Sequence, residues 1–233
     1  DQGANVRFGD FTKPESLAAA YAGGTRMLLI SVGGTQTESA GTLLKRAIDA
    51  AKAAGVKHIA YTSYVGITRG DVEGRAADHA ETEANLKASG LAWTMLRNSI
   101  YMDGLIGQAA RMIADGKATI PPNEWTIGYI AREDCAEAAA AVLATDGHEG
   151  KAYDITGPAL LGVRATAETA TAVTGKPIDV VQGGPETRPG FGREAMNFTT
   201  SHFQDLTGHA PMSVRTLFER NKERLLTPQA PRR

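Results

Sequence analysis

The amino-acid sequence predicts an α/β protein built around a parallel sheet. Three short apolar runs of β-type residues, at 27–30, 58–61 and 93–96, each end in small or polar residues and are followed by a helical pattern. Strands that are buried on both faces of a parallel sheet are continuously apolar, and their alternation with helices is typical of βαβ units. Ligands of such sheets bind beyond the carboxyl ends of the strands, so the residues after each run are the first candidates for a site.

The expected strands are short and bounded by turn-forming residues. In chain order they cover residues 5–8, 27–30, 56–62, 91–97, 125–130, 153–155 and 178–181. The connections richest in glycine, proline or charge are 66–75 and 183–192, and the tail after Thr227 is expected to fray.

Apolar residues at helical spacing indicate the helices, together with a proline in the first turn or a glycine after the last. They are expected at 15–21, 41–54, 76–88, 101–117, 132–144, 163–174 and 212–226.

Charge and apolar patterning argue against two classes of partner. The 25 Lys+Arg and 26 Asp+Glu residues give a net charge of -1 with no long run of one sign, so neither nucleic acid nor an anionic membrane is expected as the main partner. The longest apolar stretches are far shorter than the ~20 residues of a membrane-spanning helix.

The cysteine content and the first residues of the chain indicate the compartment. No secretory signal opens the chain, and the single cysteine, Cys135, excludes an intrachain disulfide, so a reducing cytoplasm is expected. Cys135 itself is expected to be an inert buried thiol. No cluster of potential ligands has metal-binding spacing, so no metal is expected.

Five segments, in the same order and spacing, carry a resemblance to a known family. They are 6–11, 54–63, 79–83, 96–101 and 147–153. On these segments the sequence resembles the NmrA-like branch of the atypical short-chain dehydrogenases, in particular its quinone reductases and triphenylmethane-dye reductases. The resemblance implies a Rossmann-like doubly wound parallel sheet over 1–157 and NADP or NAD as cofactor. It also implies a small C-terminal substrate lobe over 158–233, to which 101–125 contribute.

One departure from this family concerns the phosphate-binding turn. Members begin with a strand, a Gly-x-x-Gly-x-x-Gly turn and a helix, whereas this sequence opens at what would be the third strand, so the N-terminal β-α-β unit is expected to be absent. In a sheet of order 3-2-1-4-5-6, the strand at 5–8 would then have no neighbour. Either the sequence lacks a natural N-terminus, or the sheet is rebuilt by a shifted strand or a partner subunit.

The resemblance implies a set of cofactor-binding residues at the strand ends. They are Asp10, Phe11, Ser31, Val32, Gly33, Thr62, Ser63 and Asn98. Asp10 and Phe11 would contact the adenine, the loop at 31–33 the ribose and pyrophosphate, and Asn98 the nicotinamide carboxamide. Asp10 could equally cap the following helix, and small residues at 31–33 also suit an ordinary turn.

The catalytic candidates are Tyr64, His79 and Tyr101. The helix that carries a Tyr-x-x-x-Lys pair in the main short-chain dehydrogenases has His79 and Glu83 here, four residues apart, and an ion pair between them is the alternative to a catalytic role. Tyr64 and Tyr101 offer aromatic faces beside the expected acceptor, although Tyr101 could equally pack in the core. Arg132 is expected to order a helix start beside Asp134.

Three functions remain open from the sequence. The absence of a Tyr-x-x-x-Lys pair favours hydride transfer from NAD(P)H to a quinone-like or other pre-activated planar acceptor, which needs no strong proton donor. The alternatives are a non-catalytic NAD(P)-sensing regulator and a cofactor-free lyase or isomerase that uses His79 or Tyr64. The oligomeric state is open, with a homodimer as one option.

Overall fold

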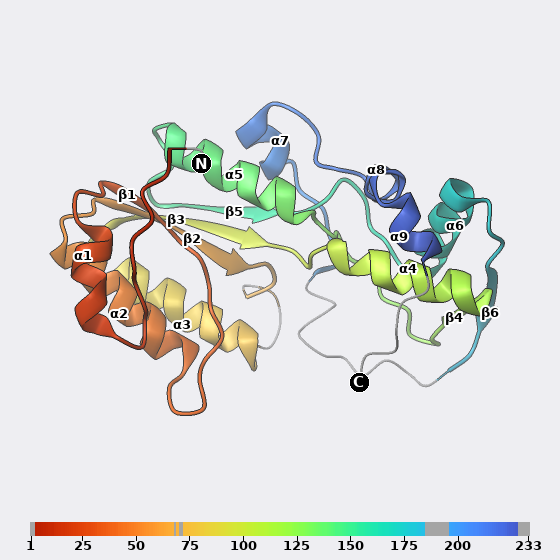
Figure 1. Ribbon diagram of the computed structural model, residues 1–233, viewed down its shortest axis with the longest axis horizontal. Coiled ribbons are helices and arrows are strands. Elements are labelled where there is room, and N and C mark those ends of the chain that lie inside the picture. The colour runs from red at the N-terminus through yellow and green to blue at the C-terminus, as the bar shows by residue number, and fades with distance from the viewer. Residues whose placement is uncertain (1–2, 68, 70–71, 185–195, 228–233) are drawn as a thin grey trace. The chain divides into compact units, whose positions relative to one another are not determined.

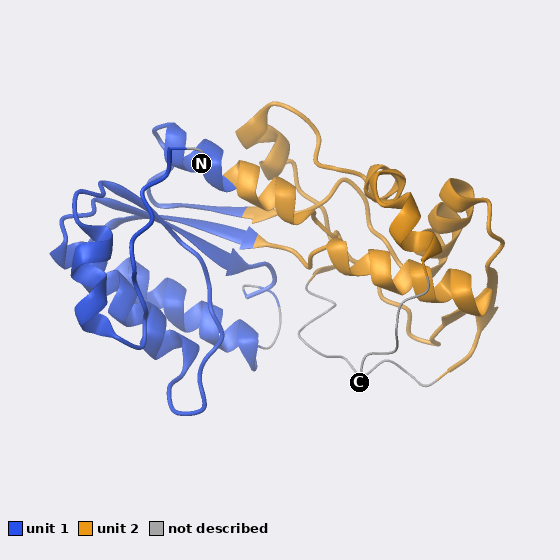
Figure 2. Ribbon diagram, in the orientation of Figure 1, with its two compact units in different colours: residues 1–97, 139–153 blue, residues 98–138, 154–233 orange. Residues whose placement is uncertain are grey.

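The computed structural model describes residues 3–67, 69, 72–184 and 196–227. The chain forms two compact units (Figure 2), unit 1 from residues 1–97 and 139–153 and unit 2 from residues 98–138 and 154–233. Parts of the loops expected at 66–75 and 183–192, and of the frayed tail, lie outside the described residues.

A four-stranded sheet organises unit 1 (Figure 1). Its strands are β1 (Arg26–Leu29), β2 (His58–Tyr64), β3 (Ala92–Asn98) and β5 (Lys151–Ile155), in the order β1-β2-β3-β5, and the last residues of β3 and β5 belong to unit 2. β1 and β2 pair in parallel, from Arg26 opposite His58 to Leu29 opposite Tyr61. The predicted parallel sheet is confirmed, with strand ends displaced by one or two residues.

Helices cover both faces of this sheet, as in a doubly wound fold. The short η1 (Pro14–Ser16) and α1 (Leu17–Tyr21) precede β1, α2 (Ala40–Ala53) and α3 (Arg75–Ala88) lie on one face, and the C-terminal part of α5 (Arg132–Ala144) lies on the other (Figure 1). The core between the sheet and α2 and α3 contains Leu29, Leu44, Ala47, Ile48, Ala51, Val56, Ile59, Tyr61, Leu86 and Met95.

The strand expected at 5–8 does not form. Residues 4–9 are extended without ladder hydrogen bonds, and Val6 and Phe8 are 96% and 68% exposed. A strand needs a neighbour to receive its backbone hydrogen bonds, and no described strand lies beside this segment. The Arg7 side chain instead donates to the carbonyl oxygen of Ala22 at 2.5 Å, after the last turn of α1.

Unit 2 is mainly helical and contains a two-stranded parallel sheet. Its elements are α4 (Asp103–Asp115), β4 (Lys117–Ile120), α6 (Val163–Thr174), β6 (Asp179–Gln182), α7 (His202–Thr207), α8 (Val214–Arg220) and α9 (Lys222–Leu226), with β4 paired to β6. Phe218, Leu217, Leu105 and Ile106 belong to its main apolar core. The helix predicted at 163–174 is confirmed without a change of bounds.

In unit 2, one predicted strand is wrong and two predicted helices differ in their extent. The helix predicted at 101–117 ends at Asp115, because Gly116 has a φ of +63°, and the unpredicted strand β4 follows. The segment 125–130 is not a strand, because Ile127 bonds to Leu161 while Ile130 bonds to Ile100, so no continuous ladder can form. The closing helix is divided into α8 and α9, and α7 was not predicted.

The described ranges lack two classes of feature. Within them, no helix is long and apolar enough to cross a bilayer. The same residues contain no group of three or more His, Cys, Asp or Glu side chains arranged to hold a metal ion.

Candidate functional site

The carboxyl ends of β1 and β2 are joined by two of the predicted cofactor residues. Thr62 Oγ1 accepts a hydrogen bond from the Ser31 backbone N–H at 2.8 Å and donates toward Ser31 Oγ at 3.3 Å. Thr62 therefore fixes the first residue of the loop after β1, and its hydroxyl is already used by the protein.

The loop after β1 is open to a ligand. Val32 is 36% exposed and the preceding Ile30 is 60% exposed. A Cβ placed on Gly33 would meet no atom within 4 Å. Exposed apolar side chains and unobstructed backbone together suit a ligand that lies along this loop.

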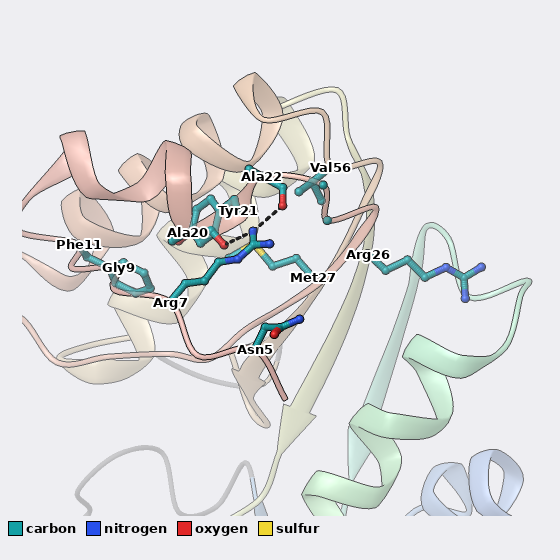
Figure 3. A pocket seen from close by; sticks show the side chains of 12 residues that line it. Asn5, Arg7, Gly9, Phe11, Ala20, Tyr21, Ala22, Arg26, Met27 and Val56 are labelled. Atoms are coloured by element: carbon teal, nitrogen blue, oxygen red, sulfur yellow. Dashed lines mark hydrogen bonds between the residues drawn. The ribbon is translucent and has the colours of Figure 1, made fainter. Parts of the chain in front are cut away.

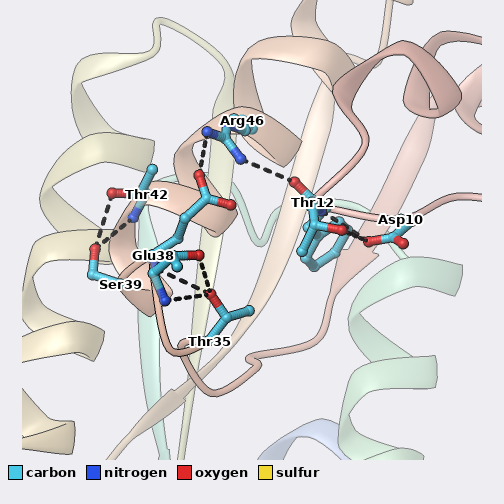
Figure 4. Close-up of polar contacts among 9 residues, drawn as sticks. Asp10, Thr12, Thr35, Glu38, Ser39, Thr42 and Arg46 are labelled. Carbon is cyan, nitrogen blue, oxygen red and sulfur yellow. Dashed lines mark hydrogen bonds and ion pairs between the residues drawn. The ribbon is translucent and has the colours of Figure 1, made fainter.

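Arg46 on α2 binds Glu38 at the far end of this loop (Figure 4) and also contacts the backbone of Phe11. Its guanidinium forms an ion pair with Glu38 and lies 3.5 Å from the carbonyl oxygen of Phe11. Thr35 Oγ1 accepts from the backbone N–H of Glu38 at 3.0 Å, and Ser39 Oγ caps α2 by accepting from the N–H of Thr42 at 3.1 Å. The loop is therefore held at both ends by short-range contacts.

Asp10 makes local contacts in the same region. Its Oδ1 accepts from the backbone N–H of Thr12 at 2.9 Å and from its hydroxyl at 2.7 Å, and these bonds lower the pKa of the Asp10 carboxyl (Figure 4). These contacts form a local turn before η1 and not the expected helix cap, since Lys13 occupies the N-cap position. Phe11 packs against the core of unit 1.

A cavity of about 180 Å³ lies among the loop after β1 and the first turns of α2 and α3, all within unit 1. It is lined by Val32, Gly33, Gly34, Ala40, Leu44, Tyr61, Arg75, Asp78 and His79. The structure thus brings three predicted site residues, Val32, Gly33 and His79, to one cavity.

His79 is held between two tyrosines. Its Nδ1 lies 2.8 Å from the Tyr61 hydroxyl, and its ring stacks on Tyr64 at 5.9 Å with a 23° interplanar angle. Burial, followed by the charge of Arg75, lowers the pKa of His79, while burial raises the pKa of Tyr61. Both side chains are therefore uncharged at neutral pH. Tyr61 was not among the predicted site residues, because in sequence it belongs to an apolar strand.

The predicted ion pair between His79 and Glu83 is not formed. Glu83 accepts from Arg97 Nε and Nη2, both at 2.8 Å, and from Ser63 Oγ at 2.8 Å, with Lys87 at 3.4 Å. Burial alone would raise the pKa of Glu83, but the bonds from Arg97 and Ser63 hold it below its usual range. Ser63 therefore belongs to a buried ionic network.

Asn98, the last residue of β3, carries an unsatisfied polar atom in unit 2. The residue is 4% exposed, and its Oδ1 is buried with no hydrogen-bond partner among the described residues. Leaving such an acceptor unpaired costs about 1–3 kcal/mol. An amide N–H of a bound molecule would relieve this cost, which is the chemistry expected of a nicotinamide carboxamide.

Tyr101 lies near Asn98 in the chain and is 38% exposed. The Arg132 guanidinium carbon is 4.9 Å from the centre of its ring, a cation–π contact, and burial raises the pKa of Tyr101. Asp103 accepts from the Arg132 N–H at 3.1 Å and Asp134 accepts from the Ala131 N–H, so both carboxylates order the start of α5. Cys135 is buried, as predicted, and burial raises the pKa of its thiol to about 12.

A larger cavity of about 590 Å³ borders β1 (Figure 3), lined in part by Arg7, Phe11, Tyr21 and Arg26. Both of its cations are engaged, Arg7 with carbonyl oxygens of α1 and Arg26 with Asp146 and the carbonyl oxygens at 143 and 145. Arg26 also marks the amino end of β1, whereas ligands of parallel sheets bind at the carboxyl ends. We therefore place the candidate site at the opposite ends of the strands.

A parallel sheet with helices on both faces, and with small and polar residues after its strands, defines a Rossmann-like nucleotide-binding protein. A sequence profile of the family described as NAD(P)H-binding matches residues 1–146, and the chain belongs to this family.

Curated relatives agree with the NmrA-like resemblance. Quinone oxidoreductase 2 of Escherichia coli (strain K12) is 34% identical over 177 residues, which are 76% of this chain and 61% of the relative. An NAD(P)H azoreductase of Xenophilus azovorans is 28% identical over 181 residues, 77% of this chain and 62% of the relative. The chain thus spans about three fifths of the length of these curated relatives.

Solved structures confirm the predicted fold, and two similar ones contain a nicotinamide cofactor. The Citrobacter sp. triphenylmethane reductase complexed with NADP(H) superposes with a TM-score of 0.82 at 26% identity, covering 94% of this chain and 84% of that one. The NADPH-dependent quinone oxidoreductase of Escherichia coli complexed with NADPH gives 0.80 at 28% identity, with coverage of 94% and 84%.

Proposed function

We propose that this protein is an NAD(P)H-dependent reductase that passes a hydride to a quinone-like or otherwise pre-activated planar acceptor. The observation that carries the proposal is the unsatisfied amide oxygen of Asn98 at the end of a sheet strand in an NAD(P)H-binding family. Relatives named as quinone and azo reductases support the choice of acceptor class.

Residues at the ends of the sheet strands would hold the dinucleotide. The backbone at Ser31, Val32 and Gly33, fixed by Thr62, would face the ribose and pyrophosphate. Asn98 Oδ1 would accept from the carboxamide N–H group. When bound, NAD(P)H supplies the hydride, and the protein orients it and excludes competing reactions.

The state of His79 supports an acceptor that needs little proton donation. A neutral imidazole bonded to Tyr61 is a weak acid at neutral pH, and Tyr61 holds its proton tightly. Reduction of a simple ketone requires a proton at the developing alkoxide. A quinone spreads the incoming charge over its ring and carbonyl oxygens, so it can take its proton from solvent after the hydride arrives.

The test is NADPH and NADH oxidation by this chain with a panel of quinones, and with a simple aliphatic ketone as control. We expect consumption of reduced nucleotide with quinones and none with the ketone. Nucleotide binding without turnover of any acceptor would favour the sensing regulator. The absence of both binding and turnover would refute the proposal.

A further inference from the structure

Unit 2 contains a cavity of about 520 Å³, a size typical of small-molecule sites. Its lining residues come from α4, β4, the start of α6 and the segments between them. They are Ile100, Leu105, Gln108, Thr119, Pro121, Glu124, Trp125, Ile127, Tyr129, Gly162, Val163, Thr166, Gly183 and Gly184. Two aromatic rings and several aliphatic side chains, together with the polar groups of Gln108, Thr119, Glu124 and Thr166, suit a planar molecule that is mainly apolar and carries a few polar atoms.

Glu124 is the only lining residue named above with a formal charge. Its Oε1 accepts from the backbone N–H of Val163 at 2.5 Å and of Arg164 at 3.4 Å, the first two residues of α6. Gly162, the N-cap, offers no side-chain cap, and a Cβ there would collide with Glu124 Oε1. The carboxylate is thus held in place at the N-terminus of α6.

A fixed carboxylate in the wall of an apolar cavity discriminates between ligands by charge. A second anion brought beside it meets repulsion that water screens only in part, since apolar walls displace solvent. An uncharged ring system meets no such repulsion, and a cation is attracted.

We propose that this cavity binds the planar acceptor and that Glu124 is its specificity-determining residue. It admits uncharged and cationic acceptors and rejects anionic ones such as sulfonated quinones. The inference rests on the proposed function for the chemical class of the acceptor. The charge selection itself rests on the position of Glu124.

Binding can be measured without turnover by the fluorescence of Trp125. The chain has two tryptophans, so a Trp93→Phe background leaves Trp125, which lines the cavity, as the only reporter. Titration with 1,4-naphthoquinone is expected to give saturable quenching. Its 2-sulfonate, of the same ring shape, is expected to bind about tenfold more weakly, as for one partly screened charge pair.

Three variants then locate the origin of the selection. Glu124→Gln keeps an oxygen for the Val163 N–H and should bring the two dissociation constants close together. Gln108→Glu adds a charge to another part of the wall and should widen their ratio. Glu168→Gln removes an exposed carboxylate from the same helix α6, outside the cavity, and should leave the ratio unchanged.

The outcomes separate this inference from the proposed function. Three results would each overturn the inference, even if NADPH oxidation is observed. They are equal affinities of the Trp93→Phe protein for the two quinones, quenching that does not saturate, and a ratio of dissociation constants that Glu124→Gln does not change. Charge-selective binding without NADPH oxidation would uphold the cavity assignment and refute the reductase proposal.

Discussion

Arg97 and Glu83 form a buried bidentate ion pair, with two guanidinium nitrogens each 2.8 Å from a carboxylate oxygen and side chains only 13% and 3% exposed. The pair ties α3 to the end of β3, and the bond from Ser63 to Glu83 adds the end of β2. Three elements of unit 1 are therefore joined where the candidate cofactor residues leave the strands.

Removal of Glu83 should be strongly destabilising. In Glu83→Ala, the Arg97 guanidinium loses its carboxylate partner within a buried environment, so we expect a loss of about 3 kcal/mol in the free energy of unfolding, measured by urea denaturation. Lys45→Ala is the control, because its i,i+4 pair with Asp49 is exposed and should contribute less than about 1 kcal/mol. Equal losses in the two variants would contradict the assignment of Glu83 as a buried structural anion.

Acid should destabilise the protein through His58. Thr94 Oγ1 donates to the carbonyl oxygen of His148 at 2.7 Å, so it accepts from His58 Nε2–H at 2.8 Å, and His58 Nδ1 is buried without a partner among the described residues. Protonation would create a buried N–H with no acceptor, and burial accordingly lowers the pKa of His58 below 6.5.

The sign of this effect follows from the two states. As the pH falls below about 6.5, His58 binds a proton in the unfolded chain but not in the folded protein. The free energy of unfolding therefore decreases until the pH reaches the lower pKa of His58 in the folded state. Urea denaturation between about pH 7.5 and 5 should show this fall, and His58→Gln should reduce it. His209→Gln is the control. The bond to Glu137 raises the pKa of exposed His209, so replacing His209 cannot reduce the loss of stability at low pH. An unchanged slope in His58→Gln would refute this origin.

The sequence was informative wherever local chemistry decides structure. The apolar runs form β1, β2 and β3 and supply Leu29, Ile59, Tyr61 and Met95 to the core, and glycines with positive φ follow the last turns of α4 and α6. These signals need no knowledge of distant residues, and they allowed the sheet, its direction and most helices to be predicted.

Contacts between distant residues were not predictable in this way. The i,i+4 spacing of His79 and Glu83 indicates a pair, but Tyr61 and Arg97, brought near by the sheet, are their actual partners. The strand β4 has only four residues and is defined by its pairing with β6, which is remote in sequence. The role of Glu124 likewise depends on α6 approaching it from 39 residues away.

Thr62 should position the loop after β1 rather than bind the cofactor directly. Thr62→Val keeps the shape of the side chain but removes the acceptor for the Ser31 N–H, so we expect a loss of about 1 kcal/mol in stability. If the loop faces the dinucleotide, the dissociation constant for NADPH should also rise severalfold, as measured by calorimetry. Thr62→Ser retains the hydroxyl and should restore both values. Unchanged NADPH affinity in Thr62→Val would contradict the proposal that this loop contacts the cofactor.

Asn98 should contribute directly to dinucleotide affinity. Asn98→Ala removes the unsatisfied Oδ1 and also the side-chain hydrogen bond to Tyr101. The complex with NADPH additionally loses the bond to the cofactor, worth about 1.4 kcal/mol or tenfold in the dissociation constant for NADPH. Ser99→Ala is the matched control, because the neighbouring Ser99 Oγ is also buried and unpaired in the described part of the chain, yet has no proposed ligand contact. Calorimetric titration of both variants with NADPH checks the prediction. A tenfold loss of NADPH affinity in Ser99→Ala, with none in Asn98→Ala, would contradict the proposed contact between Asn98 and the nicotinamide.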